Sequence, residues 1–202
     1  MNYNFEKIHE EILEKSLKYK YIKNQILINQ VLKLEKTKLD LFSFVMKSII
    51  SQQISDKAAD TIWKRYCFHF ENNNMKIKNI TDKKKFSYSL DFLQISKRKK
   101  KYIYLFYEAY MKDELKNIDL MNDDEIKKKL CSYIGIGSWT ADMALMFFFR
   151  KPNIFPLNDL IIKKVTKKLS ILENQEIDFK KIFSPHLTFF SLHLWKMSKR
   201  II

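Results

Sequence analysis

The chain contains only two glycines, and both stand in one short segment, SYIGIGSWTA at residues 132–141. A sequence that otherwise avoids glycine keeps such a pair for a backbone reason, either a positive φ angle or an approach too close for a side chain. Before the pair, acidic residues from Asp123 onward open a stretch with Ile126 and Leu130 on one helical face, and after it Ser138 can cap a new helix. The segment therefore predicts two helices joined by a tight turn.

A turn of this kind directs the glycine amides and the first N–H groups of the second helix to one side, where they can bind an anion such as phosphate. An ordinary helix–helix turn that ends at a glycine gives the same pattern without any ligand. The charge favours the phosphate, because 38 Lys and Arg residues against 23 Asp and Glu residues give a net charge of +15. Such an excess is typical of proteins that bind nucleic acid, an acidic partner or an anionic membrane surface.

One of the classes that this charge allows, an anionic membrane surface, lacks support elsewhere in the sequence. The longest apolar run, Met143–Phe149, is far shorter than the ~20 residues of a spanning helix, so no membrane partner is expected. The first residues are polar and acidic and do not form a signal peptide, which favours an intracellular protein.

The two cysteines, Cys67 and Cys131, are too few to hold a structural zinc ion or an iron–sulfur cluster by themselves. We therefore expect no iron–sulfur cluster and no disulfide framework.

The remaining sequence indicates helices almost throughout. Only three prolines accompany the two glycines, strict alternation of apolar and polar residues is rare, and Lys, Leu, Glu and Ile recur at helical spacing. We predict an all-α protein, in which residues 72–74, three asparagines, form the clearest loop. The expected helices are 5–18, 20–34, 40–53, 55–70, 82–91, 96–112, 123–134, 138–150, 159–169, 178–184 and 186–199.

Two further segments place polar residues where a loop meets a helix. In FPLNDLIIKKV, at 155–165, Asp159 stands at the start of a helix, where backbone N–H groups and the helix dipole stabilise a carboxylate. Asp159 can be a helix cap alone, or an anion that stabilises a cation formed during a reaction. In SQQIS, at 51–55, one helix ends and the next is capped by Ser55, which leaves Gln52 and Gln53 at an exposed corner. Taken alone, the corner is a connector.

In their order and spacing, these three clusters resemble the helix-hairpin-helix DNA glycosylase superfamily, and within it the 3-methyladenine DNA glycosylase II type. The resemblance covers roughly residues 40–197. The corner matches a G-Q-Q-V-S pattern except at its glycine, and Leu93–Lys99 matches L-G-I-S-x-R-K. The hairpin matches L-P-G-I-G-x-W-T-A, and 155–159 matches F-P-x-x-D. A closing motif of the form W-x-P-x-R-S…L-W is matched at Phe183, Pro185, Thr188, Leu194 and Trp195.

Proteins of this family cut the N-glycosidic bond of a damaged base in duplex DNA, after rotating the nucleotide into a pocket between two helical lobes. The resemblance implies that Asp159 is the catalytic aspartate, which stabilises an oxocarbenium-like sugar and helps to orient water. It implies that the corner, Gln53 with Gln52, enters the gap left by the extruded nucleotide. Trp139 and Trp195 match the aromatic walls of the base pocket, whose electron-rich faces favour a cationic alkylated purine.

The residue at position 139 also bears on the type of reaction. In bifunctional relatives this position is a lysine whose amine attacks the sugar, and an indole cannot form a Schiff base. The resemblance therefore implies a monofunctional glycosylase that leaves an abasic site. Met143 stands where some relatives have an aromatic pocket residue, Ile134 replaces the usual hairpin proline, and Leu187 replaces an arginine of the closing motif. These departures leave open which alkylated or deaminated purine is preferred.

The resemblance assigns the hairpin, and the basic run that starts a helix near 97, to the DNA backbone. The residues expected to bind phosphate are Gly135, Ile136, Gly137, Ser138, Thr140, Lys97, Arg98 and Lys99. A solvated charge run is the alternative for any single lysine. In the family, carbonyls of the turn often hold a monovalent cation, Na⁺ or K⁺, and by position these belong to Cys131, Tyr133 and Gly135. No other cofactor is expected.

The expected architecture has two helical lobes. Residues 40–149 form one lobe, and residues 1–39 join 150–202 in the other, because the N-terminal segment indicates helices rather than an added β domain. A cleft between the lobes is expected to hold Asp159 on one wall and Trp139 on the other. His186 and His193 lie near Trp195 in the sequence, and each is either a structural histidine or a pocket residue.

The expected partner is therefore double-stranded DNA containing damaged bases, bound by a monomer. The compartment follows the organism, the nucleus in a eukaryote and the cytoplasm in a bacterium. Two other functions remain open. One is a non-catalytic helix-hairpin-helix protein that binds damaged DNA with little turnover. The other is a basic helical RNA-binding protein, which the charge allows but which the hairpin and Asp159 do not favour.

Overall fold

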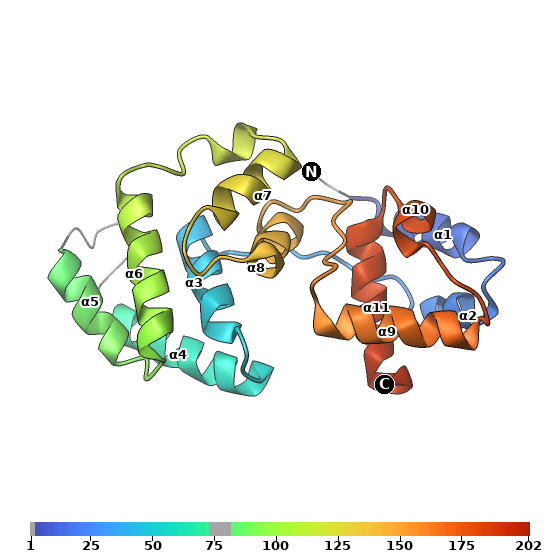
Figure 1. Cartoon of the computed structure of the whole chain (residues 1–202), viewed down its shortest axis with the longest axis horizontal. Coiled ribbons are helices and arrows are strands. Elements are labelled where there is room, and N and C mark those ends of the chain that lie inside the picture. The colour runs from blue at the N-terminus through green and yellow to red at the C-terminus, as the bar shows by residue number, and fades with distance from the viewer. Residues whose placement is uncertain (1–2, 73–81) are drawn as a thin grey trace. The chain divides into compact units, whose positions relative to one another are not determined.

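The computed structural model describes residues 3–72 and 82–202 (Figure 1). Every regular element within these ranges is helical, which confirms the prediction of an all-α protein. The α-helices are α1 (Phe5–Lys15), α2 (Lys20–Asn29), α3 (Leu41–Ser51), α4 (Asp56–Asn72), α5 (Lys83–Asp91), α6 (Lys97–Met111), α7 (Asp123–Cys131), α8 (Ser138–Met143), α9 (Leu160–Leu172), α10 (Phe179–Phe183) and α11 (Leu187–Ile201). A 3₁₀ turn, η2 (Ile118–Leu120), and a π-helical turn, η3 (Ala144–Phe148), complete the set.

The helices lie close to their expected positions, with three differences. Helix α2 ends five residues before the expected end at 34, because Gln30 adopts a φ of 58° that no right-handed helix can continue. The turn η2 was not predicted. The helix expected at 138–150 changes to π-helical geometry at Ala144. Most of the loop expected at 72–74 lies outside the described residues.

The chain divides into two compact units. One, the hairpin unit, is Lys38–Ala144, and the other, the terminal unit, is Met1–Thr37 with Leu145–Ile202. The boundaries thus fall at 37/38 and 144/145, whereas the sequence placed them at 39/40 and 149/150. Nearly all of η3 therefore belongs with the terminal unit.

Helix α3 is the centre of the hairpin unit. It packs against α4, α6 and α8, and seven of its eleven residues are buried. The ring of Phe42 lies within 6.0 Å of the rings of Phe86, Phe106 and Tyr107, so three helices meet around one aromatic cluster. This cluster anchors the first turn of α3, and the buried Ile49 and Ile50 anchor its last turn, from which the Gln52–Gln53 corner leaves.

The terminal unit is built on α9 and α11, which lie across one another (Figure 1). The apolar stripe of α9 packs with α11, and α1 and α2 cover the same core. The core includes Ile12, Ile22, Ile26, Ile162, Val165, Leu169, Phe190 and Leu194. Because α9 and α11 form the centre of this unit, residues at the first turn of α9 and at the middle of α11 become neighbours.

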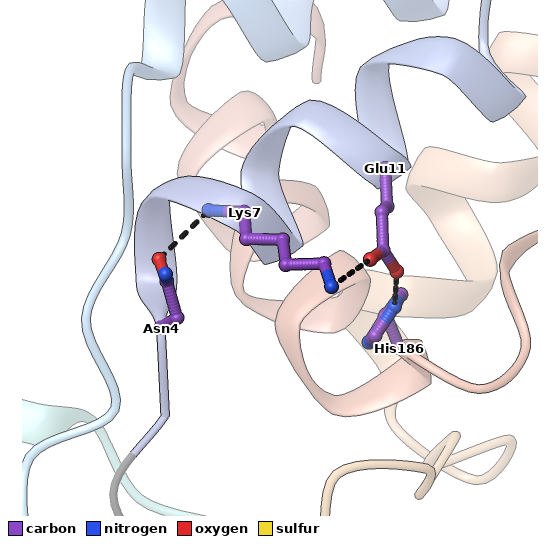
Figure 2. Close-up of polar contacts among 4 residues, drawn as sticks. All are labelled: Asn4, Lys7, Glu11 and His186. Carbon is purple, nitrogen blue, oxygen red and sulfur yellow. Dashed lines mark hydrogen bonds and ion pairs between the residues drawn. The ribbon is translucent and has the colours of Figure 1, made fainter.

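Polar contacts attach α1 to the beginning of α11 (Figure 2). The Asn4 side chain caps α1 by accepting a hydrogen bond from the Lys7 amide at 3.0 Å. His186, which precedes α11, donates from Nε2 to Glu11 Oε2, and the Lys7 ammonium lies 3.9 Å from the other oxygen of Glu11. The hydrogen bond from His186 lowers the pKa of Glu11. Of the two roles considered for His186, the structure shows the structural contact.

Candidate active site and nucleic-acid interface

Asp159 is the N-cap residue of α9. Its Oδ1 accepts hydrogen bonds from the backbone N–H groups of Ile161 and Ile162, each at 2.9 Å, and the residue is 8% exposed. These two amides have no partner within the helix, so the carboxylate oxygen satisfies them. The cap fixes the rotamer of Asp159, and the residue keeps a small accessible surface.

The Asp159 oxygen has a third donor that a cap does not need. Trp195, on α11, donates from Nε1 to Oδ1 at 3.2 Å, across 36 residues of sequence. The Trp195 indole stacks on Phe147 of η3, with ring centroids 6.0 Å apart and planes at 28°. The terminal unit therefore holds an anionic oxygen against an aromatic stack. Phe147 was not singled out in the sequence, where it is one of several aromatic residues in an apolar run.

The two glycines of the hairpin between α7 and α8 have different reasons to be glycine. Gly135 has a φ of +91°, and a Cβ placed there would lie 2.2 Å from the Tyr102 ring. Gly137 has a φ of −91°, and a Cβ there would meet no atom within 4 Å. Of this pair, only Gly135 must be a glycine for the protein's own backbone conformation and packing. Gly137 leaves exposed surface that a side chain would cover.

The start of α8 differs from the prediction that Ser138 is its cap. Gly137 occupies the N-cap position and Ser138 is the first helical residue, so no side chain caps the helix. Ile136 and Thr140 are 3% and 2% exposed, so a DNA contact at these two positions would come from the main chain. Trp139, half-buried, and Met143, buried, lie one turn apart on α8. Both belong to the hairpin unit, whereas Asp159 and Trp195 belong to the terminal unit.

The basic run at the start of α6 separates into residues with different contacts. Gln52, Arg98, Tyr102 and the hairpin residues Cys131–Gly137 line a shallow depression of about 470 Å³. The Arg98 guanidinium lies over the Tyr102 ring at 5.8 Å, beside the hairpin, and Lys97 is exposed. Lys99 instead points its ammonium at two main-chain carbonyls, those of Ile50 and Gln52, each at 2.7 Å. Burial lowers the pKa of Lys99.

The two glutamines of the corner also differ. Gln53 is exposed and has a φ of 59°. Gln52 is half-buried, and its Nε2 donates to Gly135 O at 3.0 Å and to Thr140 Oγ1 at 3.1 Å. The structure thus joins the corner to the hairpin, although the two lie about eighty residues apart in sequence.

Two of the three carbonyls expected to hold a monovalent cation already accept hydrogen bonds. Tyr133 O accepts from Ile136 N at 3.1 Å, and Gly135 O accepts from Gln52. A carbonyl oxygen has two lone pairs, so these contacts leave room for a cation at each oxygen. Within residues 3–72 and 82–202 no cluster of His, Cys, Asp and Glu side chains is suited to a metal ion.

Sequence reasoning missed one buried charge at the hairpin. Asp142, on α8, is 2% exposed and pairs with Lys127 of α7 at 2.6 Å. Burial raises the pKa of Asp142, and the hydrogen bonds from Lys127 and Ser138 partly oppose this effect. The pair connects the two helices on either side of the turn. Its only sequence signal is a charged residue within an otherwise apolar helix.

His193 lies in the core of the terminal unit. It is 1% exposed, and its Nδ1 accepts a hydrogen bond from Asn29 Nδ2 at 3.1 Å. Burial lowers the pKa of His193 to about 3, with smaller contributions from His9 and Lys196. The contact with Asn29 ties α2 to α11, which is a structural role.

Comparison with known proteins agrees with these features. The family model described as HhH-GPD superfamily base excision DNA repair protein matches residues 46–185, which include the corner, the hairpin and Asp159. The chain belongs to the HhH-GPD superfamily. The match begins within α3 and ends just before α11, so it extends over both units.

Superfamily members with similar sequences have names that refer to DNA glycosylases. YfjP of Bacillus subtilis, provisionally named a DNA-3-methyladenine glycosylase, is 30% identical over 77% of this chain and 58% of its own length. DNA-3-methyladenine glycosylase 1 of Schizosaccharomyces pombe is 24% identical over 80% of this chain and 74% of its own length. The chain thus spans less than two thirds of YfjP.

Solved structures of the HhH-GPD type share the fold. The S. pombe 3-methyladenine DNA glycosylase Mag1, in complex with abasic DNA, superposes with a TM-score of 0.72 at 22% identity, over 94% of this chain and 96% of Mag1. A DNA-3-methyladenine glycosidase from Bacillus halodurans gives a TM-score of 0.70 at 24% identity, over 94% and 89% of the two chains.

Within the described ranges, no helix combines the length and apolar character required to span a membrane.

Proposed function

We propose that this chain is a monofunctional DNA glycosylase that removes alkylated or deaminated purines from duplex DNA in base excision repair and leaves an abasic site. The observation that carries the proposal is the contact between Asp159 and Trp195, a fixed carboxylate beside an aromatic stack. Membership of the HhH-GPD superfamily and the names of the relatives support it.

The proposed chemistry uses the charge of Asp159. When the N-glycosidic bond breaks, the bonding electron pair leaves with the base and the deoxyribose becomes oxocarbenium-like. A carboxylate already oriented by three N–H donors stabilises this cation without reorganising at the moment of reaction. Water then adds to the sugar carbon and releases a proton. A purine made cationic by alkylation departs as a neutral base, whereas a deaminated purine is neutral before cleavage and departs as an anion that takes up the proton released by the water.

We propose that Trp139, Met143 and Trp195 are the residues that contact the base. An electron-rich indole face attracts a cationic purine more strongly than a neutral one, which favours alkylated bases. Trp139 also supports the monofunctional assignment, because an indole at the position of the lysine in bifunctional relatives provides no amine for a Schiff base.

We propose that the hairpin and the neighbouring basic residues bind the DNA backbone. Exposed Gly137, the uncapped start of α8 and the Arg98 side chain in the adjoining depression support this. The remaining contributors are Gly135, Ile136, Ser138, Thr140 and Lys97. The carbonyls of Cys131, Tyr133 and Gly135 would hold a Na⁺ or K⁺ ion that bridges to a phosphate. The proposal needs no other cofactor, and it takes the protein to be an intracellular monomer.

A lesion panel tests the reaction. Duplexes carrying 3-methyladenine, 7-methylguanine, hypoxanthine or ethenoadenine are incubated with the protein, and released base is measured. Asp159→Asn keeps an amide oxygen that can cap α9 but removes the charge. We expect base release to fall at least about 100-fold while affinity for the duplex is retained.

The matched control is Asp178→Asn. Asp178 caps α10 by accepting a hydrogen bond from Lys181 N at 3.0 Å, and it is exposed, so the same chemical change occurs at a helix start away from the proposed site. Near-normal turnover by Asp159→Asn would overturn the catalytic assignment. Tight binding of damaged duplex without release of any base by the wild type would support the non-catalytic alternative.

A further inference from the structure

The corner after α3 is held in a backbone conformation that its own residues do not favour. Gln53 has a φ of 59°, in the left-handed region that costs energy for any residue with a Cβ. Such a conformation persists only where the surrounding structure imposes it. The chain has its two glycines elsewhere, so something other than residue type must hold this corner.

Lys99 supplies one constraint. Its ammonium donates to Ile50 O and Gln52 O, both at 2.7 Å. These carbonyls stand at the C-terminal end of α3, where helix carbonyls have no partner within the helix and where the dipole favours a positive charge. Lys99 comes from the first turn of α6, so it connects the corner to a second helix of the same unit. The partial burial of the ammonium shows that the contact is maintained at some desolvation cost.

Gln52 supplies the second constraint. While its main-chain carbonyl accepts from Lys99, its side chain donates to Gly135 O and Thr140 Oγ1. One residue therefore links the ammonium of α6 to the hairpin and to α8. The corner and the hairpin are two of the elements proposed to meet DNA, and this network of hydrogen bonds joins them.

We propose that Lys99 is a positioning residue that holds the Gln53 corner in register with the hairpin, rather than a phosphate-binding residue. The inference rests on the proposed function, in which Gln53 fills the gap left by an extruded nucleotide. Lys99 and Arg98 then have separate tasks, although they are adjacent and equally charged. Arg98 lies in the depression beside the hairpin, and Lys99 sets the geometry of the corner.

A double-mutant cycle tests whether Lys99 acts through Gln53. The variants are Lys99→Met, Gln53→Ala and both together, assayed by single-turnover base release and by duplex affinity on the lesion that the wild type releases fastest. We expect each single variant to lower the rate of release about tenfold, with affinity within about threefold, and the double variant to be no slower than Gln53→Ala. Lys101→Met, from the same helix, removes the same charge at an exposed position and should leave the release rate unchanged. Additive losses would overturn the proposal.

Hydrogen–deuterium exchange of the free protein gives a test independent of activity. Lys99→Met should speed exchange in segments 52–55 and 135–140, while the urea midpoint of the protein changes little. Gln52→Met should speed exchange in the hairpin but not at the corner amides, because the Lys99 contacts to the main chain remain. Unchanged exchange in Lys99→Met would overturn the inference. A wild type that releases no base would count against the proposed function alone.

Discussion

At the scale of single residues, chemically identical neighbours have different tasks. Gly135 is required by a positive φ and by contact with the Tyr102 ring, whereas Gly137 meets neither condition. Gln52 bonds to the hairpin, whereas Gln53 is exposed. Gly137 is the N-cap of α8, a position that suits glycine, and its small size also leaves the neighbouring amides open to the proposed ligand, a phosphate of DNA.

Substitution at Gly137 separates binding from folding. The backbone at this position is extended, at φ −91° and ψ 175°, and the space is open, so Gly137→Val should fit without a clash. Because Gly137 is the N-cap of α8 and Val is a poor N-cap residue, the unfolding midpoint should fall only slightly. Affinity for damaged and undamaged duplexes should fall by the same factor, as measured by fluorescence anisotropy, because phosphate contacts do not read the base. A loss confined to damaged DNA would contradict the assignment. Gly135→Ala is the contrasting variant, and it should lower stability through its clash with Tyr102.

At the scale of elements, the hairpin depends on what lies beneath it. The Lys127–Asp142 pair joins α7 to α8, and a capping box at Asn122 and Glu125 fixes the start of α7. Gln52 and Lys99 connect the same region to α3 and α6. Four helices, α3, α6, α7 and α8, therefore contribute contacts that hold the turn at 132–137. Such support suits a surface that binds a DNA strand without changing its own conformation.

Removal of the Lys127 ammonium tests the buried pair. Lys127→Met leaves the Asp142 carboxylate buried without its cation, and we expect the free energy of unfolding at pH 7.5 to fall by about 2 kcal/mol, less than for a fully buried pair because the Lys127 side chain is 37% exposed. Burial already raises the pKa of Asp142, and the variant should raise it further. A carboxyl with a raised pKa in the folded state destabilises the fold as pH rises. The deficit should therefore shrink toward pH 5 in urea titrations, and a deficit that grows would contradict this account.

At the scale of the whole molecule, the stability of the terminal unit is expected to depend on pH. The terminal unit pairs the buried His193 with the half-buried His9, whose ring lies 5.4 Å from that of His193, and burial lowers the pKa of both. The unfolded chain binds a proton at His193 below its usual pKa of 6.5, whereas the folded state does not until about pH 3. Stability of this unit is therefore complete above about pH 6.5 and falls as the pH decreases.

The expected size of this effect follows from the pKa of His193. Between pH 6.5 and pH 5 the free energy of unfolding should fall by between about 1 and 2 kcal/mol, with a slope that approaches about 1.4 kcal/mol per pH unit well below pH 6.5. His193→Gln keeps a polar side chain for Asn29 but cannot titrate, so its stability should vary less over this range in urea denaturation. Equal slopes for the wild type and His193→Gln would contradict the assignment.

Much of this fold was predictable because helices are local. The 3.6-residue spacing of apolar residues and the caps at their ends predicted most of the α-helices to within a few residues, and the all-α class is confirmed. The exceptions have local causes that the spacing does not reveal, such as the left-handed Gln30 that ends α2. Family membership was also predictable, from the corner, the hairpin and the Asp159 segment, and the family match confirms it. The site assignments stay predictions that the experiments above address.

The sequence by itself determined the helical class, the position of the hairpin, the excess of positive charge and the superfamily, because each of these depends on neighbouring residues or on composition. Only the tertiary structure decided which contacts each of these residues makes. Lys99 rather than Arg98 contacts the corner, Trp195 donates to Asp159 in addition to the neighbouring amides of α9, and Asp142 is a buried ion-pair partner. These choices depend on partners that are fifteen to forty-nine residues away along the chain, and short-range spacing carries no information about such contacts.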